Sequence, residues 1–172
     1  MKALTAIALA TFAFSAQAMA ADGTIDFVGN VVANTCVINA GSQNLTVNMG
    51  NVPANALATA GQMAGQTQFA ISLTGCTGSA TKVAAKFESG QADLTTGHLN
   101  LTAAADVAQN VQVAIFDSSN VENKFGQPVP ASSFQTLSSG NATLNYSAWY
   151  IATGTATTGS ANAQTTYTLS YQ

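Results

Sequence analysis

The sequence predicts an all-β domain, an antiparallel β-sandwich built from short strands. Several segments alternate apolar and polar residues with a period of two, as strands with one buried face do. Clusters of Gly, Asn, Ser and Thr separate these segments and favour turns. No long segment shows the 3.6-residue spacing and the capping residues of an amphipathic helix. Short strands separated by turn residues are typical of a β-sandwich.

The first 20 residues are expected to be a signal peptide rather than part of the fold. Lys2 supplies a positive start, Ala3–Phe14 forms a short apolar core, and Ala18-Met19-Ala20 fits an A-x-A cleavage site. Cleavage after Ala18 fits the same rule. The apolar run is shorter than a membrane span requires. We therefore expect an exported protein that does not span a membrane.

The remaining chain has the size of one domain and carries little charge. Removing 20 of the 172 residues leaves 152, which is enough for one hydrophobic core. Three lysines then stand against seven acidic residues, and the chain has no arginine. This balance excludes the basic surface that binding to nucleic acid or to an anionic membrane requires.

The expected strands follow one another along the chain with turn residues between them. Pro53 opens a segment rich in Ala, Gly and Asn that we expect to form a loop with a helical turn around Leu57. The strands are expected at Gly23–Val32, Asn34–Ile38, Leu45–Met49, Gln66–Thr74, Lys82–Glu88, Leu99–Leu101, Val111–Ile115, Leu144–Ile151 and Thr165–Tyr171.

The segment Gly23–Val32 has an unusual apolar face. Ile25, Phe27, Gly29 and Val31 share that face, and the glycine contributes no side chain to packing. Glycine inside a strand often marks the close approach of another backbone. From the pattern alone, the segment is either the first strand of its own domain or a strand given to a neighbouring molecule.

Two cysteines, Cys36 and Cys76, indicate one disulfide in an exported protein. In the chain-entropy model such a cross-link stabilises the fold by about 4 kcal/mol. A zinc site is the weaker alternative, because His98 is the one histidine and four ligands are hard to assemble.

The C-terminal strand introduces a resemblance to a known family. Tyr167, Leu169 and Tyr171 share one face, and Tyr171 is the penultimate residue. An alternating last strand with a penultimate tyrosine resembles the pilin subunits of chaperone–usher fimbriae. Further matches, some of which resemble the major subunit of type 1 fimbriae, are Gly23–Cys36, Leu73–Cys76, Tyr150–Gly154 and Ala161–Ala163.

This resemblance implies an incomplete immunoglobulin-like sandwich that lacks its last strand and is completed by donor-strand exchange. Residues 21–35 would be the donor extension and 36–172 the pilin domain. Ile25, Phe27, Gly29 and Val31 would enter a groove beside Tyr167, Leu169 and Tyr171 of the next subunit. The implied partners are other pilin subunits, a periplasmic chaperone and an outer-membrane usher of a Gram-negative bacterium, and the implied destination is the fimbria on the cell surface. The resemblance implies no cofactor and no small-molecule substrate.

Other functions receive less support from the residues. His98 lies in a polar segment, where a lone histidine is usually solvated, and no G-x-S-x-G motif supports a hydrolase. Asp117-Ser118-Ser119 resembles a metal-dependent adhesion motif, but Val121 breaks the pattern, so we expect a turn. A two-domain tip adhesin does not fit, because the pilin pattern follows the signal peptide directly. A minor or adaptor subunit of the same kind of fimbria remains the alternative to the major subunit.

Overall fold

The computed structural model describes residues 23, 25–28 and 35–172. The contacts within the chain separate residues 1–31 from residues 32–172, and the two parts are described separately. None of the described residues before 35 lies in a helix or strand. No helix in the described part of the chain is long and apolar enough to cross a membrane.

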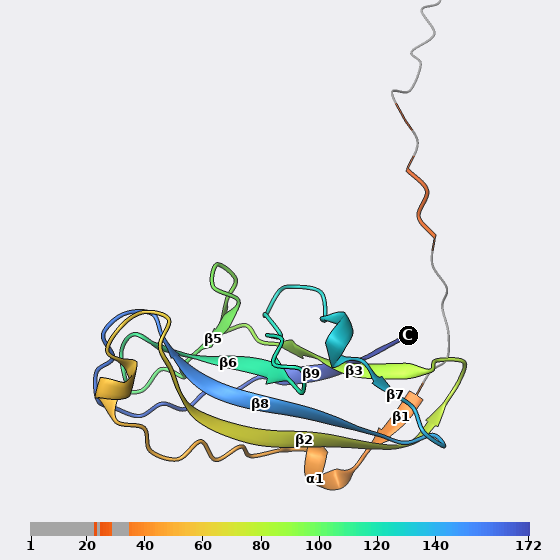
Figure 1. The fold of residues 1–172 in the computed structure, drawn as a ribbon, viewed down its shortest axis with the longest axis horizontal. Helices are drawn as coiled ribbons and strands as arrows, with labels where there is room; N and C mark the ends of the chain where they lie inside the picture. The colour runs from red at the N-terminus through yellow and green to blue at the C-terminus, as the bar shows by residue number, and fades with distance from the viewer. Residues whose placement is uncertain (1–22, 24, 29–34) are drawn as a thin grey trace, which may run out of the picture. The chain divides into compact units, whose positions relative to one another are not determined.

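Residues 35–172 form two antiparallel sheets, which confirms the predicted all-β class (Figure 1). The larger sheet has the order β1 (Thr35–Ile38), β2 (Met63–Thr77), β8 (Ala142–Ala152), β6 (Val111–Asp117), β5 (His98–Asn100) and β4 (Ala92–Asp93). The smaller sheet has the order β7 (Gln135–Thr136), β3 (Lys82–Glu88) and β9 (Thr166–Tyr171). The helical elements are single turns: α1 (Ala40–Gln43), η1 (Ala54–Leu57) and η2 (Ala131–Ser133).

The long strands β2 and β8 form the centre of the larger sheet. Their register pairs Phe69 with Tyr146 and Ile71 with Leu144. Residues opposite one another in an antiparallel pair project to the same face. The alternation that predicted these two strands therefore places their apolar residues together on the side facing the smaller sheet.

The core lies between the two sheets. Phe69 of β2, Phe87 of β3 and Tyr146 of β8 form an aromatic cluster with ring centroids 5.0–6.2 Å apart. Such edge-to-face and tilted contacts are the arrangements that aromatic quadrupoles favour. Around them pack the inward residues of the long strands, and the larger of these are Ile71, Leu73, Val83, Val113, Ile115 and Leu144.

One predicted strand is wrong and one helical turn is confirmed in the segment before β2. Leu45–Met49 alternates, yet it belongs to neither sheet, because its backbone forms no ladder with any segment of residues 35–172. Thr67 Oγ1 donates to the Asn48 carbonyl oxygen at 3.4 Å, so the segment is attached by a side chain. The helical turn expected near Leu57 is η1, and the Leu57 side chain is buried in the core.

Candidate subunit-binding site

Strand β9 is the last strand of the smaller sheet. It pairs with β3 in a register that places Tyr171 opposite Val83, Leu169 opposite Ala85 and Tyr167 opposite Phe87. The strand predicted at the C-terminus is therefore present, with its apolar residues facing the core. Among residues 35–172, no strand pairs with the other edge of β9.

The apolar face of the smaller sheet is less covered at β9 than at β3. Val83 and Ala85 of β3 have no exposed surface. Their partners Tyr171 and Leu169 are only half-buried, and so is Tyr167. Paired residues share one face of the sheet, so the side chains on this face are more exposed to solvent on β9 than on β3.

The backbone of β9 also has a free edge. Gln172 and Lys82 form a hydrogen-bonded pair, in which the N–H of each residue donates to the carbonyl oxygen of the other at 3.0 Å. Hydrogen-bonded pairs alternate with non-bonded pairs along an antiparallel ladder. The N–H and C=O groups of Tyr167, Leu169 and Tyr171 therefore point away from β3, and no described residue bonds to them. This edge can accept another strand.

The opposite edge of the smaller sheet is protected. Strand β7 pairs with the first residues of β3, and the Ala85 N–H beyond it donates to Tyr146 Oη at 3.0 Å. Residues 127–130, which include two prolines, line a small cleft together with Lys86 and Phe87. Prolines and side-chain bonds of this kind prevent strand addition. The resemblance implied the open edge at β9, whereas nothing in the sequence indicated how the opposite edge is closed.

Burial keeps the Tyr146 hydroxyl neutral at the protected edge. Burial is the main cause that raises the pKa of Tyr146 to about 12, and the negative charge of Asp117 adds to it, against the opposing effect of the Ala85 bond. Burial also raises the pKa of Tyr167. Both side chains therefore serve as neutral hydrogen-bonding groups at physiological pH.

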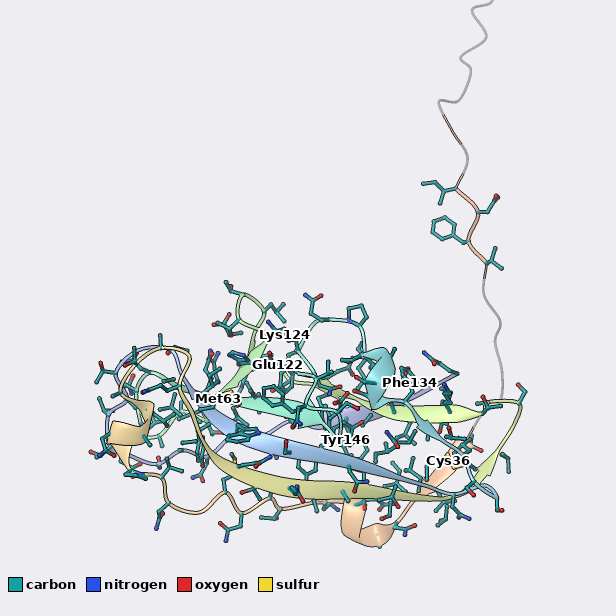
Figure 2. The ribbon with its side chains drawn as sticks, in the orientation of Figure 1. Cys36, Met63, Glu122, Lys124, Phe134 and Tyr146 are labelled. Carbon is teal, nitrogen blue, oxygen red and sulfur yellow. A yellow bond between two sulfur atoms is a disulfide. The ribbon has the colours of Figure 1, made fainter. Side chains whose placement is uncertain are left out.

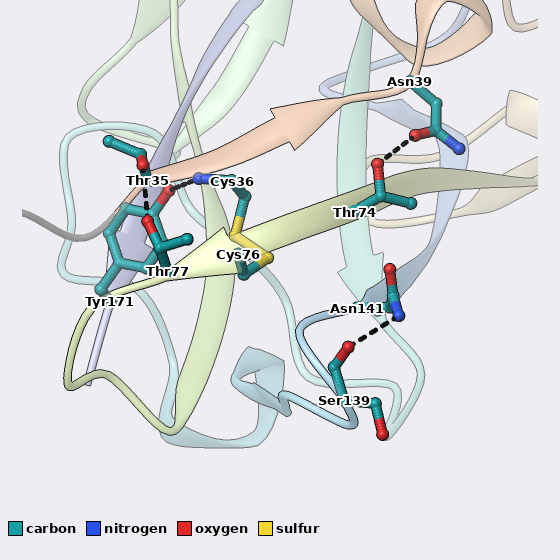
Figure 3. Close-up of a disulfide and its surroundings, with 9 residues drawn as sticks. All are labelled: Thr35, Cys36, Asn39, Thr74, Cys76, Thr77, Ser139, Asn141 and Tyr171. Carbon is teal, nitrogen blue, oxygen red and sulfur yellow. Dashed lines mark hydrogen bonds between the residues drawn. A yellow bond between two sulfur atoms is a disulfide. The ribbon is translucent and has the colours of Figure 1, made fainter.

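Two tyrosine hydroxyls connect β9 to the start of the larger sheet. Tyr171 Oη accepts the backbone N–H of Cys36 at 3.1 Å, which Figure 3 shows beside the disulfide. Tyr167 Oη donates to the carbonyl oxygen of Ser42 at 2.8 Å. Residues 35–43 thus lie across the open face from β9, and the side chains of Tyr167 and Tyr171 reach from β9 to them.

The predicted disulfide between Cys36 and Cys76 is confirmed, with an S–S distance of 2.05 Å. It joins β1 to the end of β2, where Thr35 Oγ1 and Thr77 Oγ1 lie 3.1 Å apart (Figure 3). The first described residues of the sandwich are therefore fixed covalently beside Tyr171.

The predicted donor residues lie only partly within the described residues. Ile25 and Phe27 are 80% and 93% exposed, and Val28 is exposed as well. Gly29 and Val31 lie outside the described residues. The pairing of this segment with a groove stays a prediction.

The prediction that His98 is a solvated loop residue is wrong. His98 begins β5, its side chain is 12% exposed, and its Nε2 lies 2.8 Å from Glu122 Oε1. The turn expected after Asp117 is present, but the Asp117 carboxylate is buried and points inward. Within the described residues, no group of three or more His, Cys, Asp or Glu side chains could hold a metal ion.

Comparison with known proteins decides the family. The model of the family described as fimbrial protein matches residues 25–172. The chain belongs to this fimbrial protein family. An F17 fimbrial protein of Escherichia coli is 42% identical over 169 residues, covering 93% of each chain. The major fimbrial subunit SMF-1 of Stenotrophomonas maltophilia is 43% identical over 162 residues, covering 90% of this chain and 95% of its own.

Two further comparisons confirm the resemblance and the fold. The type-1 fimbrial protein A chain of Escherichia coli K12 is 37% identical over 175 residues, covering 98% of this chain and 94% of its own. A subunit in a solved chaperone–usher pilus superposes with a TM-score of 0.64 at 18% identity, covering 88% of this chain and 96% of that one. The protein is therefore a fimbrial subunit with an immunoglobulin-like antiparallel sandwich.

Proposed function

We propose that this fimbrial subunit forms the fibre shaft by polymerising head-to-tail through donor-strand exchange. The observation that carries the proposal is the edge of β9, where half-buried apolar side chains occur together with backbone groups to which no described residue bonds. An added strand supplies both missing partners at once: its backbone bonds to the edge, and its alternate side chains cover the core.

The donor in this proposal is the extension formed by residues 21–35 of the neighbouring subunit. Ile25, Phe27, Gly29 and Val31 recur every two residues, which is the spacing of one strand face. Tyr167, Leu169 and Tyr171 have the same spacing on β9. Because donor and acceptor are different surfaces, the contact is heterologous and grows an open filament.

The proposal includes the route to the fibre. Residues 1–20 direct export and are removed, and a periplasmic chaperone covers the β9 edge until the outer-membrane usher adds the subunit to the fimbria on the cell surface. An uncovered edge would otherwise recruit other chains. The proposed role is structural rather than catalytic, as for the fimbrial proteins that the chain resembles.

An adaptor subunit is the second candidate, because it would use the same edge and the same extension. The shaft is favoured because one relative with 43% identity is described as a major fimbrial subunit. Quantitative mass spectrometry of purified fimbriae separates the two roles. A shaft subunit is the most abundant protein of the fibre, whereas an adaptor is present in a few copies per fibre.

Thermal unfolding with a donor peptide tests the proposal directly. A variant lacking residues 21–33 is compared with and without a peptide of residues 21–35. The peptide should raise the unfolding temperature strongly, since a ligand that binds only the folded state stabilises it by mass action. A Gly29→Val peptide is the matched control and should lose most of this effect. A truncated protein that is already stable and ignores the peptide would overturn the proposal.

A further inference from the structure

Strand β3 has a backbone edge on the side opposite β9, here called the opposite edge. Alternate residues of β3, starting at Lys82, bond to β9. The residues between them are Val83, Ala85 and Phe87, and their N–H and C=O groups point to the opposite edge. Strand β7 pairs with β3 at Lys82 and Val83, and no described residue bonds to the N–H or C=O group of Phe87. The backbone of β3 can therefore accept a strand here unless other residues cover it.

The segment between β6 and β7 covers the opposite edge. Residues 118–134, here called the covering loop, include residues 127–130, which lie against Lys86 and Phe87. Figure 2 labels Phe134, the last residue of this loop, and Tyr146 of β8, whose hydroxyl accepts the Ala85 N–H. The covering loop and β7 together close the opposite edge along its length.

The carboxylate of Asp117, the last residue of β6, joins the two ends of the covering loop. At the start of the loop, Oδ1 accepts the backbone N–H groups of Ser119 and Val121, each at 2.9 Å. Near its end, Oδ2 accepts the hydroxyl of Ser133 at 3.0 Å and also that of Ser132. Each oxygen thus has two donors, although the side chain is buried.

The single turn η2 has few other attachments to the sandwich. Its backbone bonds are local, such as that from the Ser133 N–H to the Pro130 carbonyl oxygen at 3.0 Å. Ser133 Oγ also lies 3.1 Å from Asn123 Oδ1, but Asn123 belongs to the covering loop itself. Among the described residues, Asp117 is the one residue of either sheet that forms a hydrogen bond with η2.

Strand β7 follows η2 closely and depends on where η2 is held. It pairs with β3 at two positions, and beyond it the Leu137 N–H donates to the Thr81 carbonyl oxygen at 2.8 Å. A strand this short has few bonds of its own, and segments with few bonds open at low cost. Loss of the η2 attachment should therefore release residues 127–136 from β3 while β9 stays paired.

We propose that Asp117 is a positioning residue that keeps the opposite edge closed, so that each subunit accepts a donor strand at β9 alone. The inference rests on the proposed donor-strand exchange. A subunit with two open edges would take two donors, and head-to-tail growth would then branch. Asp117 stands opposite Tyr146 in the register of β6 and β8. Two paired side chains of the larger sheet thus close this edge, one by holding η2 and the other by accepting a β3 N–H.

Hydrogen exchange measures whether Asp117 keeps the edge closed. The mature protein, residues 21–172, is compared by mass spectrometry as wild type, Asp117→Ala and Asp93→Ala. In Asp117→Ala we expect about tenfold faster exchange in residues 82–88 and 131–136, and unchanged exchange in the central sheet. Unchanged exchange in these two segments, or equal acceleration throughout the subunit, would overturn the inference.

Asp93→Ala is the matched control for loss of a carboxylate. Asp93 also accepts backbone N–H groups of its own turn, from Thr95 at 2.9 Å and Thr96 at 3.4 Å, and a side-chain bond from Gln112. None of these partners belongs to η2 or β7. This variant should leave the exchange of residues 131–136 as in the wild type.

The number of donor strands bound per subunit tests the consequence for assembly. The same three proteins are mixed with an excess of a peptide of residues 21–35 and examined by native mass spectrometry. Wild type and Asp93→Ala should bind one peptide, and Asp117→Ala should bind two. One peptide on Asp117→Ala would overturn this inference and leave the proposed function standing. If none of the three proteins bound the peptide, the proposed donor-strand exchange would fail, and the inference with it.

A second variant removes the same attachment from the loop side. Ser132→Ala combined with Ser133→Ala deletes both hydroxyl donors and keeps the two backbone bonds of Asp117. It should give the same exchange pattern and the same peptide count as Asp117→Ala, and it decides the question if Asp117→Ala does not fold. Near-ultraviolet circular dichroism checks the folding of each protein. Wild-type behaviour of the folded double variant would contradict the role of Asp117.

Discussion

Tyr171 accepts the backbone N–H of Cys36 at 3.1 Å, which links the penultimate residue of the chain to the first cysteine. The bond joins the free edge of the smaller sheet to the residue that the disulfide fixes on β2. The two sides of the open face are thereby held at a set separation. For the proposed donor-strand exchange, such a preformed site would lower the ordering cost of binding.

Tyr171→Phe should destabilise the subunit by about 1 kcal/mol, because the Cys36 N–H loses its acceptor while the ring packing is kept. Urea unfolding of the purified protein measures the change. Thr168→Ser, on the outward face of the same strand, is the control and should have little effect. A Tyr171→Phe midpoint equal to that of the wild type would mean that water replaces the bond at no cost.

Leu169→Glu should abolish polymerisation, because a charge would replace a half-buried side chain at the free edge. Thr168→Glu adds the same charge to the exposed face of β9 and should leave assembly intact. Electron microscopy and size analysis of the polymers measure the outcome, and near-ultraviolet circular dichroism checks that each subunit is folded. Normal fibres from folded Leu169→Glu would show that strands are not added beside β9.

Asp117→Asn should destabilise the subunit at neutral pH by about 2 kcal/mol, as expected for hydrogen bonds to a charged group. Burial alone would raise the pKa of Asp117, but hydrogen bonds from Ser132, Val121, Ser133 and Ser119 outweigh it and lower the pKa. Ser133 Oγ, for example, donates to Asp117 Oδ2 at 3.0 Å.

The sign of the Asp117 effect follows from this lowered pKa. A carboxylate with a depressed pKa stabilises the fold above the ordinary value of 3.8, and the effect is lost as pH falls through the value in the folded state. The stability difference between wild type and Asp117→Asn should therefore shrink below pH 4, as acid titration followed by tryptophan fluorescence would show. A difference that grows on acidification would contradict the assignment.

Ser139→Asn should stabilise the turn between β7 and β8 by about 0.5 kcal/mol. Ser138 and Asn141 exchange two backbone bonds at 2.9 Å, and Ser139 and Gly140 between them both have positive φ angles, of 49° and 74°. A two-residue turn of this type favours Asn followed by Gly. Thermal unfolding measures the gain. Gly140→Ala is the opposite control and should destabilise, because an added Cβ would lie 3.3 Å from the Cys76 carbonyl oxygen.

Features that depend on neighbouring residues were readable from the sequence. The period-two pattern of Gln66–Thr74 predicted the central part of β2, and the C-terminal alternation predicted β9. Two cysteines in an exported chain can form one internal pair, so the disulfide followed from composition. The resemblance to the pilin family also depended on short segments of sequence, such as the alternating C-terminal strand.

Features that depend on distant partners were decided by the tertiary structure. Leu45–Met49 alternates like a strand but pairs with none of the described strands. His98 lies in a polar, loop-like segment of the sequence, yet its ring contacts Glu122, 24 positions along the chain. The buried carboxylate of Asp117 accepts hydrogen bonds from the hydroxyls of Ser132 and Ser133, 15 and 16 positions along the chain.

The sequence by itself determined the strand periodicity, the one possible cysteine pair and the family of this protein. The resemblance implied an open groove beside Tyr167, Leu169 and Tyr171, and only the tertiary structure decided that the opposite edge of the smaller sheet is closed by β7 and the Tyr146 hydroxyl. The physical reason is that alternation records which side of a strand faces the core. Strand order and hydrogen-bond satisfaction instead depend on which segments meet after the chain has folded.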